Sequence, residues 1–206
     1  MICSIYRPKY KPEIDLKEML RYAGAGTAVD SDIREHAESA ALMCQEKAQP
    51  ACVYCICEVT TVADSYVILD GKYTLKGTTV AKYLSDCRAV LVVVATIGVL
   101  VDRMIRLADC RSSFAGLLAD AAGSAAIEGL LDDFCSKISL QSYPKSRISP
   151  GYGDFLLSNQ ETIFSMLDVT KNIGVCLNDS LLMSPSKSVS AIVGCRQNFK
   201  NTFCAD

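Results

Sequence analysis

Residues 89–101 read "AVLVVVATIGVLV" and form the longest apolar run in the chain. Residues 89–98 of this run are apolar at nearly every position, without the alternation of a strand that has one solvated face. A strand with this continuous pattern is buried on both faces, so we expect it to be central in its sheet and to lead into a helix. Arg88 and Asp102 bound the run, which falls well short of the ~20 residues that a membrane span needs.

The patterns on either side of this run predict an α+β fold. Expected helices cover residues 15–22, 30–48 (with Asp30 or Ser31 as N-cap), 77–87, 100–110, 112–138 and 159–169. Strands are expected over 51–62 and 65–69, with an Asp-Gly hairpin turn at 70–71, and residues 173–194 read as two strands around a polar turn that close the sheet. We expect one domain over 1–206, with a loosely ordered lead-in at 1–12 and a loosely ordered, cysteine-containing tail at 196–206.

The composition excludes several classes of protein. With 21 Lys or Arg and 23 Asp or Glu residues, the formal net charge is −2, and no basic cluster emerges that could neutralise phosphates. The first 15 residues lack the apolar segment of a signal peptide. We therefore expect a cytoplasmic protein that binds neither nucleic acid nor membrane.

The eleven cysteines are scattered through the expected helices and strands, and a chain of this length folds without disulfides. The tightest group is Cys52, Cys55 and Cys57 in "CVYCIC". On a strand, Cys55 and Cys57 share one face while Cys52 points to the other, which is poor geometry for one metal ion. With His36 as the only histidine, the pattern favours buried thiols and no metal site; cysteine-ligated metal or an iron–sulfur cluster is the alternative.

The long helix over 112–138 carries two unusual features. Its three glycines, at 116, 123 and 129, indicate close approach of another backbone or of a ligand. Asp120, Ser124, Glu128 and Asp132 recur every four residues and form a polar stripe. This stripe reads either as a solvated face or as a wall toward a polar ligand.

The stretch "RISPGYGDFLL" (residues 147–157) follows this helix. Arg147 supplies a planar fork for a carboxylate, and Tyr152 supplies an aromatic face that attracts cations. Pro150 and the glycines on either side of Tyr152 allow backbone groups to approach a ligand closely. Together these groups suit an amino acid that also carries a cation, although a Pro-Gly turn between elements has much the same composition.

Residues 147–194 resemble the activation (reactivation) domain of cobalamin-dependent methionine synthase. Its R-x-x-x-G-Y motif is present as Arg147, Gly151 and Tyr152, followed by a helix, by "IGVxLxxS" and by "M-x-P-x-x-SVSA" over residues 183–191. Upstream, "ATIGVLVDRMI" and "DAAGSAAIE" resemble free-standing, single-domain members of the family. The resemblance implies a twisted, mainly antiparallel sheet with flanking helices.

The resemblance also implies an S-adenosylmethionine-binding module that acts in trans on a cobalamin-dependent methionine synthase or another corrinoid methyltransferase. Such a domain supports reductive remethylation of cob(II)alamin carried by the partner, with an electron donor such as flavodoxin or ferredoxin. It needs no catalytic residue of its own, because cobalt is the nucleophile and the protein binds and orients.

Carried over to this sequence, the family's roles fall on seven residues. Arg147 would hold the methionine carboxylate of the ligand, and the backbone around Ser149 and Gly151 would contact the ligand. Tyr152 would lie near the sulfonium and the corrin. Asp15 matches a ligand-binding aspartate near the start of the family's domain, and Glu128 or Asp132 would supply an acidic wall.

The chain departs from the family at two places. After Gly151 and Tyr152 it has Gly-Asp-Phe-Leu where the family has Pro-Ala-Cys-Pro, and the family's longer ending with further tyrosines is absent. These departures leave an alternative function, that of a docking or capping protein for a corrinoid protein that has lost S-adenosylmethionine binding.

Overall fold

The computed structural model describes residues 2–25, 30–138 and 146–196. At its centre lies strand β5 (Ala89–Thr96), which is buried along its whole length. It pairs antiparallel with β2 (Ala51–Val62) on one side and with β8 (Ser188–Cys195) on the other. The central position that its continuous apolar sequence predicts is thus confirmed.

The main sheet has six strands in the order β4-β3-β2-β5-β8, with β1 also paired to β2. Its remaining strands are β1 (Ser4–Tyr6), β3 (Tyr66–Leu69) and β4 (Tyr73–Lys76). Every pairing between described strands is antiparallel. The β3–β4 hairpin turns at Asp70 and Gly71, both with positive φ, as the Asp-Gly signal predicts.

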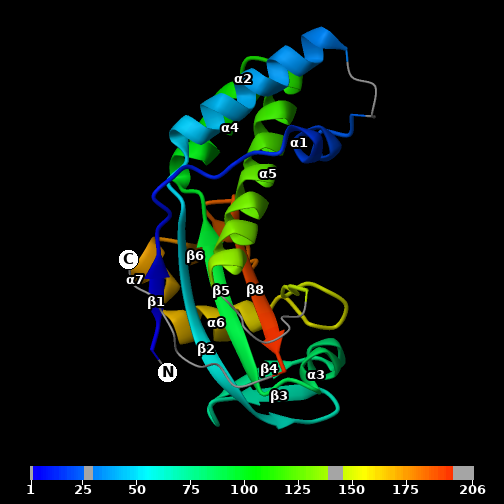
Figure 1. The fold of residues 1–206 in the computed structure, drawn as a ribbon, viewed down its shortest axis with the longest axis vertical. Helices are drawn as coiled ribbons and strands as arrows, with labels where there is room; N and C mark the ends of the chain where they lie inside the picture. Colours follow the sequence, from blue (N-terminus) through cyan, green and yellow to red (C-terminus); the bar gives the residue numbers. More distant parts are fainter. Residues whose placement is uncertain (1, 26–29, 139–145, 197–206) are drawn as a thin grey trace.

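Helices cover both faces of this sheet (Figure 1). On one face, Leu91 and Val93 of β5 belong to a core shared with α1 (Leu16–Tyr22), α2 (Ser31–Lys47), α4 (Val99–Asp109) and α5 (Ser113–Lys137). On the other face, Val90 and Val92 belong to a core shared with α3 (Thr78–Leu84), α6 (Asn159–Leu167) and α7 (Val169–Ile173). The α+β fold with a curled antiparallel sheet and flanking helices is therefore as predicted.

Helix α5 is, by length and composition alone, able to cross a membrane. In the fold, 61% of the most apolar 18-residue stretch of α5 is buried inside the protein. Buried residues recur along most of α5, against the sheet and against α1, α2 and α4. Its apolar character is that of a core helix.

The glycines of α5 allow the close backbone approach that the sequence indicates. A Cβ at Gly129 would lie 2.5 Å from the backbone oxygen of Glu13, whereas the nearest atoms to a Cβ at Gly123 belong to the Lys187 side chain, at 3.0 Å. The lead-in before α1 therefore lies directly against the backbone of α5 at Gly129.

We expect Gly129→Ala to lower the free energy of unfolding by about 1–3 kcal/mol, because the new methyl group overpacks against backbone. Gly123→Ala, in the same helix, is expected to be neutral or mildly stabilising, since alanine favours a helix by roughly 1 kcal/mol over glycine. Urea unfolding of both variants checks the pair; equal effects would contradict the close approach at Gly129.

The C-terminal strands differ in part from the prediction. Residues 173–194 contain three strands, of which β6 (Cys176–Leu177) and β7 (Met183–Ser184) form a separate two-stranded sheet, and only β8 joins the main sheet. The Asn178 side chain accepts from the backbone N–H groups of Ser180 and Leu182, which closes a tight turn directly after β6 and keeps that pair short.

Both chain ends carry features that the sequence did not indicate. Within the lead-in 1–12, Ser4–Tyr6 forms β1 on the sheet, a strand that was not predicted. Directly before the tail 196–206, Cys195 is the buried last residue of β8. Residues 197–206, including Cys204, lie outside the described residues.

Candidate functional site

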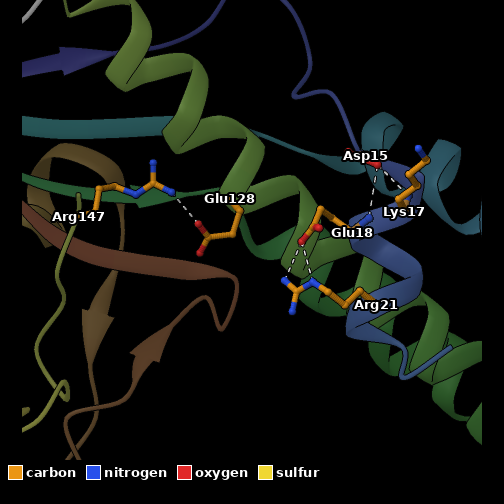
Figure 2. A network of polar contacts seen from close by, with 6 residues as sticks. All are labelled: Asp15, Lys17, Glu18, Arg21, Glu128 and Arg147. Atoms are coloured by element: carbon orange, nitrogen blue, oxygen red, sulfur yellow. Dashed lines mark hydrogen bonds and ion pairs between the residues drawn. The ribbon is translucent and has the colours of Figure 1, made fainter. Parts of the chain in front are cut away.

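Arg147 is held at the edge of the sheet, beside α5. Its neighbour Ile148 exchanges two backbone hydrogen bonds with Ile192 of β8, at 3.1 and 2.9 Å. From there the Arg147 guanidinium reaches α5, where Nη2 lies 2.8 Å from Oε2 of Glu128 and Nη1 lies 2.6 Å from Oδ1 of Asp132 (Figure 2 shows the contact with Glu128). One arginine thus holds two carboxylates that are one helical turn apart.

The charge state of this arginine follows from two opposed effects. Partial burial of Arg147 lowers its pKa, but hydrogen bonds and charge interactions with Asp132 and Cys135 together raise it by more, so the pKa stands above its ordinary value. The Arg147 side chain is 24% exposed, whereas Asp132 is largely open to water. The guanidinium is therefore a permanent cation beside a pair of accessible anions.

These residues line a cavity of about 590 Å³, within the usual size of small-molecule sites. Its apolar side comes from Leu131 of α5 and from three residues of β8, namely Val189, Ala191 and Val193. Its polar side includes Ser146 and five of the predicted site residues, which are Glu128, Asp132, Arg147, Ser149 and Tyr152. The structure thus brings together residues from α5 and from the loop after it.

Tyr152 stands at the rim of this cavity, with 69% of the residue exposed. The loop that carries it is tight: the Gly151 N–H donates to the Phe155 oxygen at 2.6 Å, and the Tyr152 N–H donates to the Ser149 oxygen at 3.2 Å. Gly151 and Gly153 both have positive φ, which favours glycine at these two positions. The loop therefore presents an aromatic ring to the outside from a defined backbone.

Asp154 fastens this loop to the start of α3. Its carboxylate accepts from the N–H groups of Thr78 and Thr79 and from the Thr78 hydroxyl, each at 2.7 Å. The N-cap residue of α3 is Gly77, which has no side chain for capping, so Asp154 supplies the cap from 76 residues away in sequence. "Gly-Asp-Phe", where the chain departs from the family pattern, is thus a structural anchor.

This anchor predicts a pH-dependent contribution to stability. The hydrogen bonds from Thr79 and Thr78 hold the pKa of Asp154 well below its usual range. A carboxyl with a lowered folded-state pKa stabilises the fold above its unfolded-state value of about 3.9, and this contribution is lost as the pH falls toward the folded-state pKa. We expect Asp154→Asn to lower the urea midpoint at pH 5–8 and the difference from wild type to shrink below about pH 4. Asp179→Asn, in an exposed turn, is the control, and a difference that grows in acid would contradict the cap.

Asp15 is not brought into this cavity. Its carboxylate caps α1, accepting from the Lys17 N–H at 2.8 Å and the Glu18 N–H at 3.4 Å (Figure 2). Asp15 lines a second, larger hollow of about 1190 Å³, to which Glu128 and Asp132 also contribute. The two hollows therefore share an acidic wall on α5, with Arg147 on one side and Asp15 on the other.

The polar stripe of α5 is paired with cations along its length. Lys187, just before β8, places Nζ 2.8 Å from the Asp120 carboxylate and 3.0 Å from the Ser124 hydroxyl. Lys187, Thr78 and Thr79 were not singled out in the sequence, and Asp154 was noted only as part of the departure from the family pattern. Only the missing N-cap side chain at Gly77 offered a sequence signal for the anchor.

The arrangement suits binding rather than bond-breaking by protein groups. Cys135 is the thiol that lines the cavity, and burial raises its pKa, which disfavours the reactive thiolate. A fork for a carboxylate, two carboxylates for an ammonium group, an apolar side and an exposed aromatic ring match a zwitterionic ligand with an apolar part. Among the described residues, no group of three His, Cys, Asp or Glu is placed to hold a metal ion.

Comparison with known proteins gives the context of this site. The family model described as "Vitamin B12 dependent methionine synthase, activation domain" matches residues 132–203, roughly a third of the chain and including the Arg147 loop. A solved structure described as "Crystal Structure of the MetH Reactivation Domain bound to AdoHcy" is similar with a TM-score of 0.68 and 12% identity, covering 98% of this chain and 81% of that chain. A search of curated proteins found no match. The resemblance seen in the sequence is thereby confirmed: residues 132–203 match the activation-domain family of vitamin B12-dependent methionine synthase, and the chain has the fold of the MetH reactivation domain.

Proposed function

We propose that this chain is an S-adenosylmethionine-binding reactivation module that acts in trans on a cobalamin-dependent methionine synthase or a related corrinoid methyltransferase. The observation that carries the proposal is Arg147, which lies between Glu128 and Asp132 in a cavity rimmed by Tyr152. Asp132, Arg147 and Tyr152 belong to the segment that matches the activation-domain family, and Glu128 lies one helical turn before it. The AdoHcy bound by the structurally similar domain supports a ligand of this class.

The charges of the cavity fit this ligand. S-adenosylmethionine carries one carboxylate, one ammonium group and one sulfonium, whereas the cavity offers one guanidinium and two carboxylates. On binding, the ligand carboxylate replaces Glu128 or Asp132 as an ion-pair partner of Arg147. The displaced carboxylate then forms an ion pair with the ligand ammonium group. Because ion pairs replace ion pairs, no charge is left buried without a partner.

The remaining predicted residues have supporting roles. The backbone oxygen of Ser149 and the N–H of Gly151 already form hydrogen bonds within the loop. We therefore expect the Ser149 hydroxyl and the Gly151 carbonyl to contact the ligand. Tyr152, exposed at the rim, faces the sulfonium and the corrin of the docked partner. Asp15 lines the neighbouring hollow and contacts the part of the ligand that extends beyond Glu128 and Asp132 into that hollow.

Cobalamin belongs to the partner and supplies the nucleophile; a flavodoxin- or ferredoxin-type donor supplies the single electron for its reduction. This chain binds S-adenosylmethionine, orients its methyl group toward the corrin and keeps bulk water away from the apolar side of the cavity. Such a module works in the cytoplasm, beside the corrinoid protein that it serves.

A reconstitution experiment tests the proposal. The inactive cob(II)alamin form of a methionine synthase that lacks its own activation domain is mixed with a one-electron reductant, S-adenosylmethionine and this chain. We expect the methylcobalamin absorption spectrum to appear only when all components are present. A spectrum that stays that of cob(II)alamin, although titration calorimetry shows S-adenosylmethionine bound, would overturn the reactivation role while leaving the site intact.

A second candidate is a docking or capping module for a corrinoid protein that does not use S-adenosylmethionine. The observation that favours it is the saturation of Arg147 by two carboxylates, with which a ligand must compete. Capture of a cobalamin protein by this chain, with no heat on titration of S-adenosylmethionine and no effect of that ligand on capture, would support the docking function.

A further inference from the structure

Three cysteine thiols that take no part in the proposed ligand site gather where β1 joins the sheet. Cys55 and Cys57 are buried in the core on the α6 face of β2, with their Sγ atoms 3.5 Å apart. Cys3 lies immediately before β1 and is exposed, and its thiol donates to the Met166 oxygen of α6 at 3.4 Å. All three thiols are thus on the same face of the sheet, as predicted for Cys55 and Cys57, while Cys52 belongs to the opposite core.

The register of β1 places Cys3 opposite Cys55. Ser4 pairs with Tyr54 and Ile5 pairs with Val53, so each step back along β1 is a step forward along β2. One more step brings Cys3 to Cys55. Residues directly opposite in an antiparallel pair have Cα atoms about 4.5–5.5 Å apart, within the range of about 4.4–6.8 Å that a disulfide spans.

The Cys55–Cys57 pair is less suited to a disulfide. The two residues lie two positions apart on one extended strand, so their Cα atoms are about 6.6 Å apart, near the upper limit for a bond. The cross-strand pair also includes the exposed thiol, which an external reagent reaches first. Geometry and access therefore favour Cys3 with Cys55.

We propose that Cys3 and Cys55 form a reversible disulfide that ties β1 to β2 when the protein meets an oxidised low-molecular-weight disulfide. The Cys3 thiolate attacks one sulfur of that disulfide, a mixed disulfide forms and one small thiol leaves. Cys55 then attacks the Cys3 sulfur, and the second small thiol leaves. Two protein thiols are oxidised, and one external disulfide is reduced to two thiols.

The pKa values of the Cys3 and Cys55 thiols determine the rate of this exchange. Burial, and then the nearby Cys57, raise the pKa of Cys3, and the hydrogen bond with Cys57 followed by burial raises the pKa of Cys55 far above its ordinary value. Since the thiolate is the attacking species, the exchange is slow at neutral pH and is about tenfold faster for each added pH unit below these pKa values.

The disulfide would strengthen the attachment of the chain's first strand. β1 has only three residues and lies on the side of β2 away from β5, and the segment that follows it leads to Glu13, which packs against Gly129. Closing the loop from residue 3 to residue 55 restricts the unfolded chain, so we expect oxidation to raise the Tm on the order of 5–10 °C.

Peptide mapping of the full chain tests the proposal. The protein is incubated with oxidised glutathione at pH 7.5 and 8.5 and digested with trypsin without reductant. We expect the peptide of residues 1–9 to be linked to the peptide of residues 48–72 through Cys55, with faster formation at pH 8.5. In Cys55→Ser, glutathione is expected to remain on Cys3 as the mixed disulfide.

Thermal unfolding supplies the controls. Cys3→Ser should remove the oxidative rise in Tm, and Cys110→Ser, at an exposed cysteine after α4, should keep it. Because the mapping needs only wild-type protein, it remains decisive if a variant folds poorly. A linkage between Cys55 and Cys57, or Cys3 carrying glutathione alone in the wild type, would overturn the proposal.

Discussion

Replacing Arg147 with alanine is expected to weaken S-adenosylmethionine binding by about 30- to 1000-fold, since removing one partner of a charged hydrogen-bonded pair that the ligand covers costs about 2–4 kcal/mol. The guanidinium is the cation held between the two acidic side chains of the cavity. Without this cation, Glu128 and Asp132 still attract the ligand ammonium group, but they repel the ligand carboxylate. Isothermal titration calorimetry of the full chain measures the change.

Two further arginine variants define the cause of this loss. Arg147→Lys keeps the charge but not the planar fork, so we expect an intermediate affinity. Arg34→Ala removes an arginine from an exposed ion pair with Glu38 on α2 and is expected to leave the affinity unchanged. Equal affinities for wild type and Arg147→Ala would refute the assignment of this cavity.

Replacing Phe155 with alanine is expected to lower the free energy of unfolding by about 3–5 kcal/mol, the usual cost of deleting a large buried aromatic side chain. Phe155 is fully buried in the core beneath the sheet, directly after the Asp154 anchor. Its backbone oxygen also accepts from the Gly151 N–H. The ring therefore fills the core, while the Phe155 backbone closes the base of the Tyr152 loop.

Leu156 provides a matched control for Phe155. It is the next residue and is 59% exposed, so Leu156→Ala should change the free energy of unfolding by less than about 1 kcal/mol. Urea unfolding measures both variants. If Phe155→Ala folds at low temperature, titration with S-adenosylmethionine should also show weaker binding, because the loop loses the buried ring next to the Asp154 anchor. Full affinity would show that the loop does not depend on Phe155.

Features that depend on neighbours in sequence were predictable. The nearly continuous apolar pattern of residues 89–98 places β5 at the centre, because a strand without the alternation of a solvated face must be covered on both faces. The Asp70-Gly71 pair predicts its hairpin because these residues accept positive φ. Arg147 and Tyr152 were predicted as site residues because side-chain chemistry and the family motif coincide in one loop, and the structure places both at one cavity.

Features that join distant segments were not predictable from local patterns. The sequence carries no sign that Asp154 caps α3 or that Lys187 meets Asp120, because each contact joins segments more than 60 residues apart. The same holds for β1, whose three residues are too few to show a strand pattern. For Asp15, the family resemblance predicted contact with the ligand, whereas the structure shows its carboxylate as the N-cap of α1.

By itself, the sequence determined the identity of the central strand, the helices around it apart from α7, and the chemistry of the loop over residues 147–157. Those properties follow from hydrophobic pattern, backbone preference and side-chain charge, which are local. Only the tertiary structure decided that Arg147 lies between Glu128 and Asp132, that the Tyr152 loop is fastened to α3 and that Asp15 lies in the neighbouring hollow. Such contacts depend on how the helices pack on the sheet, and packing places side chains together without regard to their separation along the chain.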